Sequence, residues 1–261
     1  DKEQIAPIEE FKKFAELGFA GMTIPEQYGG QKLDDISEAI VIEELSRVDP
    51  SLGVMVAVHV GLCSMTIALS GSETQKEKYL PKLASGEFLG AYSLSEAGSG
   101  TDAAAMVAKA TDDGDYYTLN GEKMWVTNGT TADLFVLFAK VTDHPDYGKK
   151  SHGGVTCFII EKGFEGFEIG KKEDKLGIRS SDTCTLILNN CKVPKENVLG
   201  EVGKGFPIAM NALDNSRIGI AAQGLGIAQG AYETALKYSK ERETFGTVSY
   251  THLRAHETGI N

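Results

Sequence analysis

The chain has 261 residues, of which 41% are hydrophobic and 24% are charged. These values are typical of a globular protein, and the length is enough to bury a sizeable core in more than one domain. The formal charge of −11 argues against binding to nucleic acid and against docking on an anionic membrane. The four cysteines lack C-x-x-C spacing and histidines at metal-ligand spacing, which indicates reduced structural thiols and no metal site.

The pattern of residues 1–87 predicts helices. Residues 9–17 carry apolar side chains at three-residue steps, and residues 35–46 begin with acidic side chains, which favour a helix N-terminus. Asp49 and Pro50 suit the N-cap and first position of the helix that follows. Ser72 begins a further helix that extends to about Ala84. We therefore predict an N-terminal α-helical domain over residues 1–87.

Residues 52–69 form an 18-residue stretch without a formal charge. This length reaches the lower limit for a membrane span. Two glycines, His59, Ser64 and Thr66 dilute the stretch, and no basic residue flanks its start. A helix buried on all sides inside a bundle explains it better than membrane insertion.

From Phe88 onward the hydrophobic period becomes that of β-strands. The Asn120-Gly121 pair between two alternating segments predicts a β-hairpin with a type I′ turn over residues 115–126. Further short strands are predicted at 134–139, 155–160, 167–169 and 183–188. Their regular spacing and glycine-rich turns predict a small barrel or sandwich domain over residues 88–199.

A long helical segment follows, from Phe206-Pro207 to about Arg242. At over thirty residues it needs neighbouring helices, and its glycines offer a surface for close helix contact. We interpret residues 200–246 as the start of a C-terminal helical-bundle domain. Helical periodicity disappears after Gly246, so residues 247–261 are predicted to be a non-native tail.

Two polar motifs stand out against this background. The first, residues 92–102, reads Tyr-Ser-Leu-Ser-Glu-Ala-Gly-Ser-Gly-Thr-Asp, and the second, residues 123–129, reads Lys-Met-Trp-Val-Thr-Asn-Gly and holds the only tryptophan. Positive φ at Gly98 and Gly100 would let successive backbone amides form a nest for anionic oxygen. Such a loop with an indole nearby suits a ligand with phosphates and a flat ring. The alternative interpretation is that the first motif is a polar turn and that the tryptophan of the second is an ordinary core residue.

The two motifs together resemble the flavin motifs of the acyl-CoA dehydrogenases. The resemblance extends from about Ile5 to Gly246 and is closest to short-chain, butyryl-type members. It is carried also by the segments Ile-Pro-Glu-Gln-Tyr-Gly-Gly (24–30), Lys-Tyr-Leu-Pro-Lys-Leu (78–83), Lys-Leu-Gly-Ile-Arg (175–179) and Val-Pro-Lys-Glu-Asn (193–197). The resemblance implies a multi-domain α+β fold, truncated at both ends relative to the family.

The resemblance further implies FAD-dependent α,β-dehydrogenation of a short-chain acyl-CoA in fatty acid β-oxidation. It implies an electron-transfer flavoprotein as acceptor, a homodimer or homotetramer, and a location in the bacterial cytoplasm or mitochondrial matrix. Arg242 would reach the FAD of a neighbouring subunit. The implied cofactor-binding residues are Tyr92, Leu94, Ser95, Gly100, Thr101, Trp125, Val126, Thr127 and Arg242. The implied substrate-binding residues are Thr101, Asp214, Asn215, Ser216 and Arg217, although a plain i,i+3 ion pair also explains Asp214 and Arg217.

The resemblance assigns no residue of this chain as the catalytic base that accepts the α-proton of the substrate. Most of the family place the catalytic glutamate in a C-terminal segment that this chain does not contain, and a minority place it at the position of Ser216. Glu96 lies in the flavin motif but has no such role in the family. The chain is therefore predicted to be inactive alone. Two alternatives are a flavin-dependent monooxygenase or oxidase on the same fold, and a non-catalytic flavin- or acyl-CoA-binding module.

Overall fold

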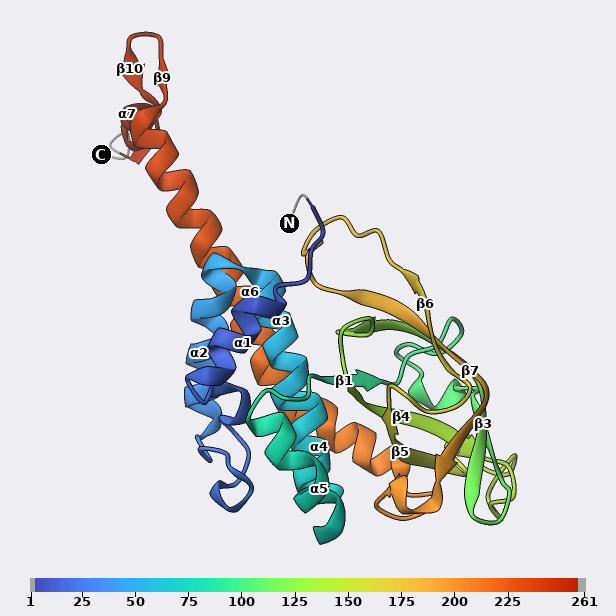
Figure 1. The fold of residues 1–261 in the computed structure, drawn as a ribbon. Helices are drawn as coiled ribbons and strands as arrows, with labels where there is room; N and C mark the ends of the chain where they lie inside the picture. Colours follow the sequence, from blue (N-terminus) through green and yellow to red (C-terminus); the bar gives the residue numbers. More distant parts are fainter. Residues whose placement is uncertain (1–2, 258–261) are drawn as a thin grey trace.

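A computed structural model describes residues 3–257 (Figure 1). Its N-terminal part is helical, as predicted, and the local capping signals explain where the helices begin. Asp49 accepts hydrogen bonds from the Ser51 and Leu52 amides, and Ser72 forms a capping box with Gln75. The helices are α1 (Ile8–Glu16), η1 (Phe19–Gly21), η2 (Glu26–Tyr28), α2 (Asp35–Val48), α3 (Pro50–Ala57), η3 (Val58–Ser64), α4 (Met65–Ser70) and α5 (Glu73–Ala84).

The apolar stretch forms one helical rod, Pro50–Ser70, with a π-helical middle at η3. Within residues 3–257 it is the one helix whose length and composition would allow it to cross a membrane. The protein itself buries 72% of the apolar window, as expected for a core helix of a bundle. His59 lies in the π-helical turn, where its Nδ1 accepts the Gly90 amide and its Nε2 lies 3.2 Å from the Leu83 carbonyl. The side chain thus ties the rod to the first strand.

The middle part is a single eight-stranded sheet in the order β6-β7-β3-β2-β4-β5-β8, with β1 pairing in parallel with β4. This confirms a β-domain between two helical parts. Its apolar strands β4 and β5 are buried on both faces apart from single residues near their ends. The strands are β1 (Gly90–Ser93), β2 (Lys109–Asp112), β3 (Tyr116–Thr127), β4 (Leu134–Val141), β5 (Val155–Glu161), β6 (Phe167–Lys172), β7 (Thr183–Pro194) and β8 (Val198–Leu199), with 3-10 turns η4 (Ala103–Ala105) and η5 (Lys195–Asn197).

The hairpin predicted over residues 115–126 is wrong. Asn120 and Gly121 lie inside the continuous strand β3, which pairs antiparallel with β7 along its length and has an irregularity at this point. Gly121 is needed there because its φ is +150° and an added Cβ would lie 2.8 Å from Ala108. The hairpin that does form joins β2 to β3 through a turn in which the Asp113 amide donates to the Tyr116 carbonyl.

The last long helix is α6 (Gly205–Glu241), which packs along α2 and then extends beyond the body of the molecule (Figure 1). Gly226 and Gly230 allow the close approach, because an added Cβ at either would lie 2.2 Å from a backbone oxygen of α2. Beyond α6 lie β9 (Glu243–Thr244), β10 (Thr247–Val248) and α7 (Ser249–Glu257). The helix α7 corrects the expectation that helical structure ends at Gly246.

All four cysteines, Cys63, Cys157, Cys184 and Cys191, are buried and free of disulfides. Burial raises the pKa of each thiol, that of Cys63 to about 12. Unreactive thiols packed among apolar side chains agree with the structural role predicted from their spacing.

Candidate functional site

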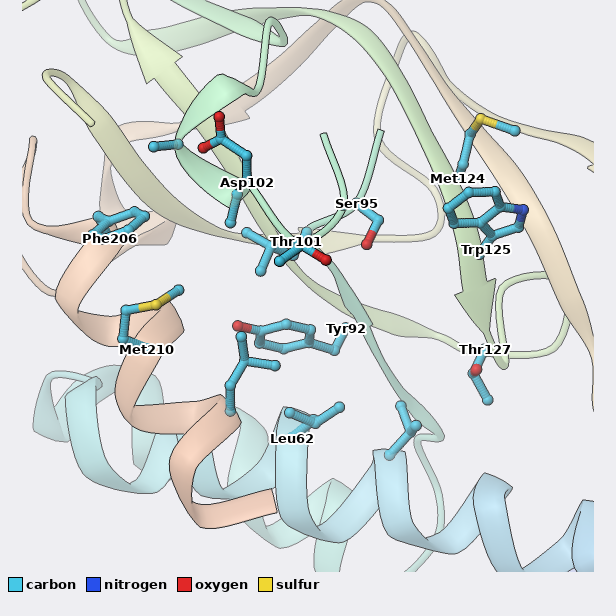
Figure 2. A pocket seen from close by; sticks show the side chains of 16 residues that line it. Leu62, Tyr92, Ser95, Thr101, Asp102, Met124, Trp125, Thr127, Phe206 and Met210 are labelled. Carbon is cyan, nitrogen blue, oxygen red and sulfur yellow. The ribbon is translucent and has the colours of Figure 1, made fainter. Parts of the chain in front are cut away.

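A cavity of about 450 Å³ lies where the helical rod, the sheet and the start of α6 meet. Figure 2 shows the rod and α6 forming one wall and the two sequence motifs forming the other. Val58 and Leu62 come from η3, and Phe206, Met210 and Leu213 come from α6. The two motifs contribute Tyr92, Leu94, Ser95, Gly100, Thr101 and Asp102, together with Met124, Trp125 and Thr127. The cavity is thus apolar on its helical side and hydroxyl-bearing on its sheet side.

The first motif forms a loop after β1. Mutual backbone hydrogen bonds between Glu96 and Ser99 close it, and the Ser99 hydroxyl donates to the Asp102 carbonyl. The expected positive φ at Gly98 and Gly100 is wrong, because neither glycine lies in the left-handed region. An added Cβ at either position would meet no heavy atom within 4 Å. These glycines therefore leave open space beside the loop and do not provide an unusual turn geometry.

The strained backbone belongs to the second motif. Trp125 has φ +57° and Asn128 has φ +65°, in a region that non-glycine residues seldom adopt. A register irregularity between Lys123 and Val126 accompanies them and turns the 57% exposed Trp125 ring toward the cavity, while Val126 is buried in the core. Asn128 is fully buried and donates to the Met55 and Gly90 carbonyls, which ties the motif to both α3 and β1.

Tyr92 places a polar atom in the middle of the site. Its hydroxyl is buried and has no hydrogen-bond partner within residues 3–257. In Figure 2 the ring lies across the cavity with its hydroxyl toward Met210. Burial raises the pKa of Tyr92 well above its ordinary value, so the hydroxyl remains a donor. Buried polar groups are normally paired, so this hydroxyl is suited to a ligand contact.

The predicted substrate residues lie on α6, directly after the cavity-lining Leu213. Asp214 and Arg217 form an ion pair whose side chains are both exposed, and Asn215 is exposed beside them. The Ser216 hydroxyl donates to the Leu213 carbonyl at 3.3 Å. These four residues border the cavity without lining it. Arg242 follows the last residue of α6, at the end that extends away from the body in Figure 1.

Two carboxylates near the site have defined surroundings. Glu96 is buried and bonded to Lys123 and to two backbone amides, which leaves it no access to the cavity. Glu38, on α2, packs beside the π-helical turn, where its Oε1 would lie 3.0 Å from a Cβ added to Gly61. Ser216 faces the same glycine. Burial raises the pKa of Glu38 to about 7.

The side chains that form the helical wall of the cavity were not predicted from the sequence. Val58 and Leu62 lie in the uncharged stretch, which indicated burial but not which side chains face a ligand. Phe206 begins the predicted long helix. Its position directly after three glycines was the one feature of the sequence that could have indicated a cavity-lining residue on this helix. Helical spacing then places Met210 and Leu213 on the same face as Phe206.

A cavity of this size, apolar with a few hydroxyls and set between domains, is typical of enzymes that hold an organic cofactor or substrate. Sequence models of three acyl-CoA dehydrogenase domains match the chain: the N-terminal domain over residues 1–87, the middle domain over 91–191 and the C-terminal domain over 203–256. The chain belongs to the acyl-CoA dehydrogenase family.

Three similar proteins place it within this family. A short-chain specific acyl-CoA dehydrogenase of Clostridium acetobutylicum is 49% identical over 94% of this chain, which spans 64% of that protein's length. The butyryl-CoA dehydrogenase structure from Megasphaera elsdenii is similar at TM-score 0.92 and 42% identity, over 98% of this chain and 67% of that one. An acyl-CoA dehydrogenase from Bacillus anthracis, complexed with FAD, is similar at TM-score 0.85 and 40% identity, over 92% of this chain and 40% of that one.

Proposed function

We propose that this chain carries the FAD site and part of the acyl-CoA site of a short-chain acyl-CoA dehydrogenase. The observation that carries the proposal is the cavity itself, where the two flavin-type motifs face an apolar wall built by η3 and α6. Two of the relatives named above support the substrate class, since the Clostridium protein is named for short-chain acyl-CoA and the Megasphaera protein for butyryl-CoA.

The residues of the cavity fit a flavin. The unpaired Tyr92 hydroxyl offers a buried donor, and the 57% exposed Trp125 indole offers a flat apolar surface. The open space beside Gly98 and Gly100 leaves room for a bulky anionic group next to backbone amides. When bound, FAD would supply the hydride acceptor for oxidation of the acyl chain.

The protein's own side chains would orient the reactants. The Ser95 and Thr127 hydroxyls would hydrogen-bond the ring system, Trp125 would pack against it, and Thr101 would contact both cofactor and substrate. The apolar side chains of Leu62 and Met210 would exclude water from the acyl chain. Asp214 to Arg217 would meet the CoA portion outside the cavity.

We further propose that this chain supplies no proton acceptor. Ser216 occupies the alternative base position with a hydroxyl, and the carboxylate of Glu96 is fully engaged. Asp102 is the one carboxylate among the cavity-lining residues within 3–257, but it is exposed, and Figure 2 shows its carboxylate pointing away from the Tyr92 ring, so we do not propose it as the acceptor. A missing general base typically lowers the rate about 10²–10⁴-fold. The 261-residue chain should therefore bind its ligands without oxidising the substrate.

The test is an anaerobic titration of the FAD-loaded chain with butyryl-CoA, in which loss of the flavin's visible absorbance reports oxidation of the substrate. We expect no bleaching by the chain itself. A chimera that continues after Gly246 with the C-terminal part of the Clostridium relative should bleach within the mixing time. Rapid bleaching by the chain alone would overturn the proposal, and Asp102→Asn and Glu38→Gln would then identify the acceptor. Reaction with oxygen but no bleaching of the chimera would favour an oxidase instead.

The remaining parts of the proposal concern the whole protein. An electron-transfer flavoprotein would reoxidise the flavin, and Arg242 would contact the FAD of a neighbouring subunit in a homodimer or homotetramer. The position of Arg242 at the far end of α6 supports such a reach toward another molecule. The location would be the cytoplasm of a bacterium or the mitochondrial matrix of a eukaryote.

A further inference from the structure

A buried ion pair lies directly behind the two motifs. The Lys123 ammonium is 2.7 Å from the Glu96 carboxylate and 3.0 Å from the Leu94 carbonyl oxygen. The two side chains are 0% and 4% exposed, and neither lines the cavity. Burial lowers the pKa of Lys123, whereas the carboxylate opposes this and favours the charged ammonium. Two buried charges are tolerated when both are paired and their other hydrogen-bonding sites are filled.

The carboxylate of Glu96 has further partners. It accepts the Val107 amide at 2.6 Å and the Ala108 amide at 3.1 Å. These residues lead into β2, so Glu96 connects the loop after β1 to the next strand. The backbone of Glu96 also closes the loop through its two hydrogen bonds with Ser99. Glu96 therefore holds the hydroxyl-bearing loop in two ways, through its side chain to the residues before β2 and through its backbone to Ser99.

Lys123 occupies the matching position in the second motif. It directly precedes the irregular part of β3 in which Trp125 has φ +57°. The Met124 amide donates to the Ser95 carbonyl at 2.9 Å, next to the ion pair. The loop half of the site and the tryptophan half are therefore joined at one place by contacts from Lys123 and Met124.

We propose that Glu96 and Lys123 are positioning residues that set the separation between the two halves of the ligand site. The inference rests on the proposed FAD site and assigns the ion pair a role in shaping it, without contact to the ligand. An apolar pair of similar volume would not do this, because it would leave the Leu94 carbonyl and the Val107 and Ala108 amides without partners. The two charges together satisfy all three groups.

The test compares Lys123→Met with Lys192→Met. Lys192 forms a 2.9 Å ion pair with Glu165 on the surface, so its removal is a matched control on the neighbouring strand β7. We expect Lys123→Met to bind FAD about tenfold or more weakly, since small displacements of positioned groups are costly, and Lys192→Met to bind within about twofold of the wild type. Lys123→Met/Glu96→Gln should bind no more weakly than Lys123→Met, because the pair acts as a unit.

Amide hydrogen exchange supplies a readout that needs no flavin. In Lys123→Met the amides of Val107, Ala108 and Met124 should exchange about tenfold faster, while those of the β4–β5 ladder keep wild-type rates. Failure of the wild type to bind FAD would refute the proposed function, and the exchange pattern would still decide the role of the pair. Wild-type FAD affinity in Lys123→Met would overturn the inference. Equal acceleration in β4–β5 would also overturn it, because the pair would then stabilise the whole sheet.

Discussion

His59 should make the stability of the protein fall when the pH is lowered from 7 to 5. Its ring is fully buried, its Nδ1 accepts the Gly90 amide, and its Nε2 contacts the Leu83 carbonyl. The Gly90 bond assigns the neutral tautomer with the proton on Nε2, since an acceptor nitrogen cannot carry a proton. Burial lowers the pKa of His59 from 6.5 to about 4. Protonation would place an unpaired charge in the core and remove the Gly90 hydrogen bond.

The direction of the effect follows from this depressed pKa. The unfolded chain takes up a proton below about pH 6.5, whereas the folded protein resists it until about pH 4. Stability is therefore present above the unfolded value and is lost progressively between these limits. For a pKa lowered from 6.5 to about 4, linkage gives a loss of about 2 kcal/mol between pH 7 and pH 5.

The assay is urea unfolding followed by circular dichroism at pH 7, 6 and 5, for the wild type and for His59→Gln. Glutamine keeps one acceptor and one donor but does not titrate, so the difference between the two proteins isolates the histidine. We expect the wild type to lose about 2 kcal/mol more than His59→Gln over this range. Equal losses in both proteins would refute the assignment of a neutral, buried imidazole.

Three further substitutions test the structure elsewhere. Glu38→Gln should stabilise the protein by about 3 kcal/mol at pH 8 but not at pH 4, because the pKa raised from 4.5 to about 7 makes ionisation of Glu38 unfavourable in the folded protein. Urea unfolding at both pH values checks this. Asn128→Ala should cost about 3 kcal/mol, since two buried carbonyls lose their donor; an unchanged urea midpoint would contradict those bonds. Gly121→Ala should lower the free energy of unfolding by about 2 kcal/mol or more and so lower the melting temperature. An unchanged melting temperature would show that φ +150° is not required at this position.

The helical part of the fold was predictable because its signals are local. Asp49-Pro50 and the Ser72 capping box define helix starts within four residues of sequence, and the structure confirms both. The uncharged stretch likewise indicated a buried helix. Its π-helical turn at residues 58–64 had no signature in the sequence.

The strand region shows where local signals fail. Asn120-Gly121 is a strong turn signal, yet pairing of β3 with β7 from Tyr116 to Thr127 keeps the chain extended through it. The hydrogen bonds of a long ladder outweigh the preference of two residues. Only the position of β7 some seventy residues later decides the outcome, and no local pattern contains that information.

The candidate site was predictable in part. Tyr92, Ser95, Thr101, Trp125 and Thr127 were predicted from the motifs, and the structure brings them to one cavity. The prediction of positive φ at Gly98 and Gly100 was wrong, because the positive φ values of the two motifs lie at Trp125 and Asn128 instead. The roles of the predicted residues in binding FAD and acyl-CoA stay predictions.

The Glu96–Lys123 pair could not be found from the sequence. Its members lie 27 residues apart, on a loop and on a strand, and charged residues in polar motifs are usually exposed. The contact depends on the irregular section of β3, which is itself a product of long-range pairing. Contacts that form only through tertiary packing, such as this ion pair, therefore cannot be predicted from local sequence motifs.

We propose that the two motifs bind FAD, and equilibrium dialysis of the chain against FAD measures this binding. The wild type should retain FAD, and Trp125→Ala should bind it about fivefold more weakly, through lost aromatic packing of about 1 kcal/mol. Tyr238→Ala, an exposed aromatic residue on the distant part of α6, is the matched control and should bind like the wild type. No retention of FAD by the wild type, or equal retention by Trp125→Ala, would show that the two motifs do not form the FAD site.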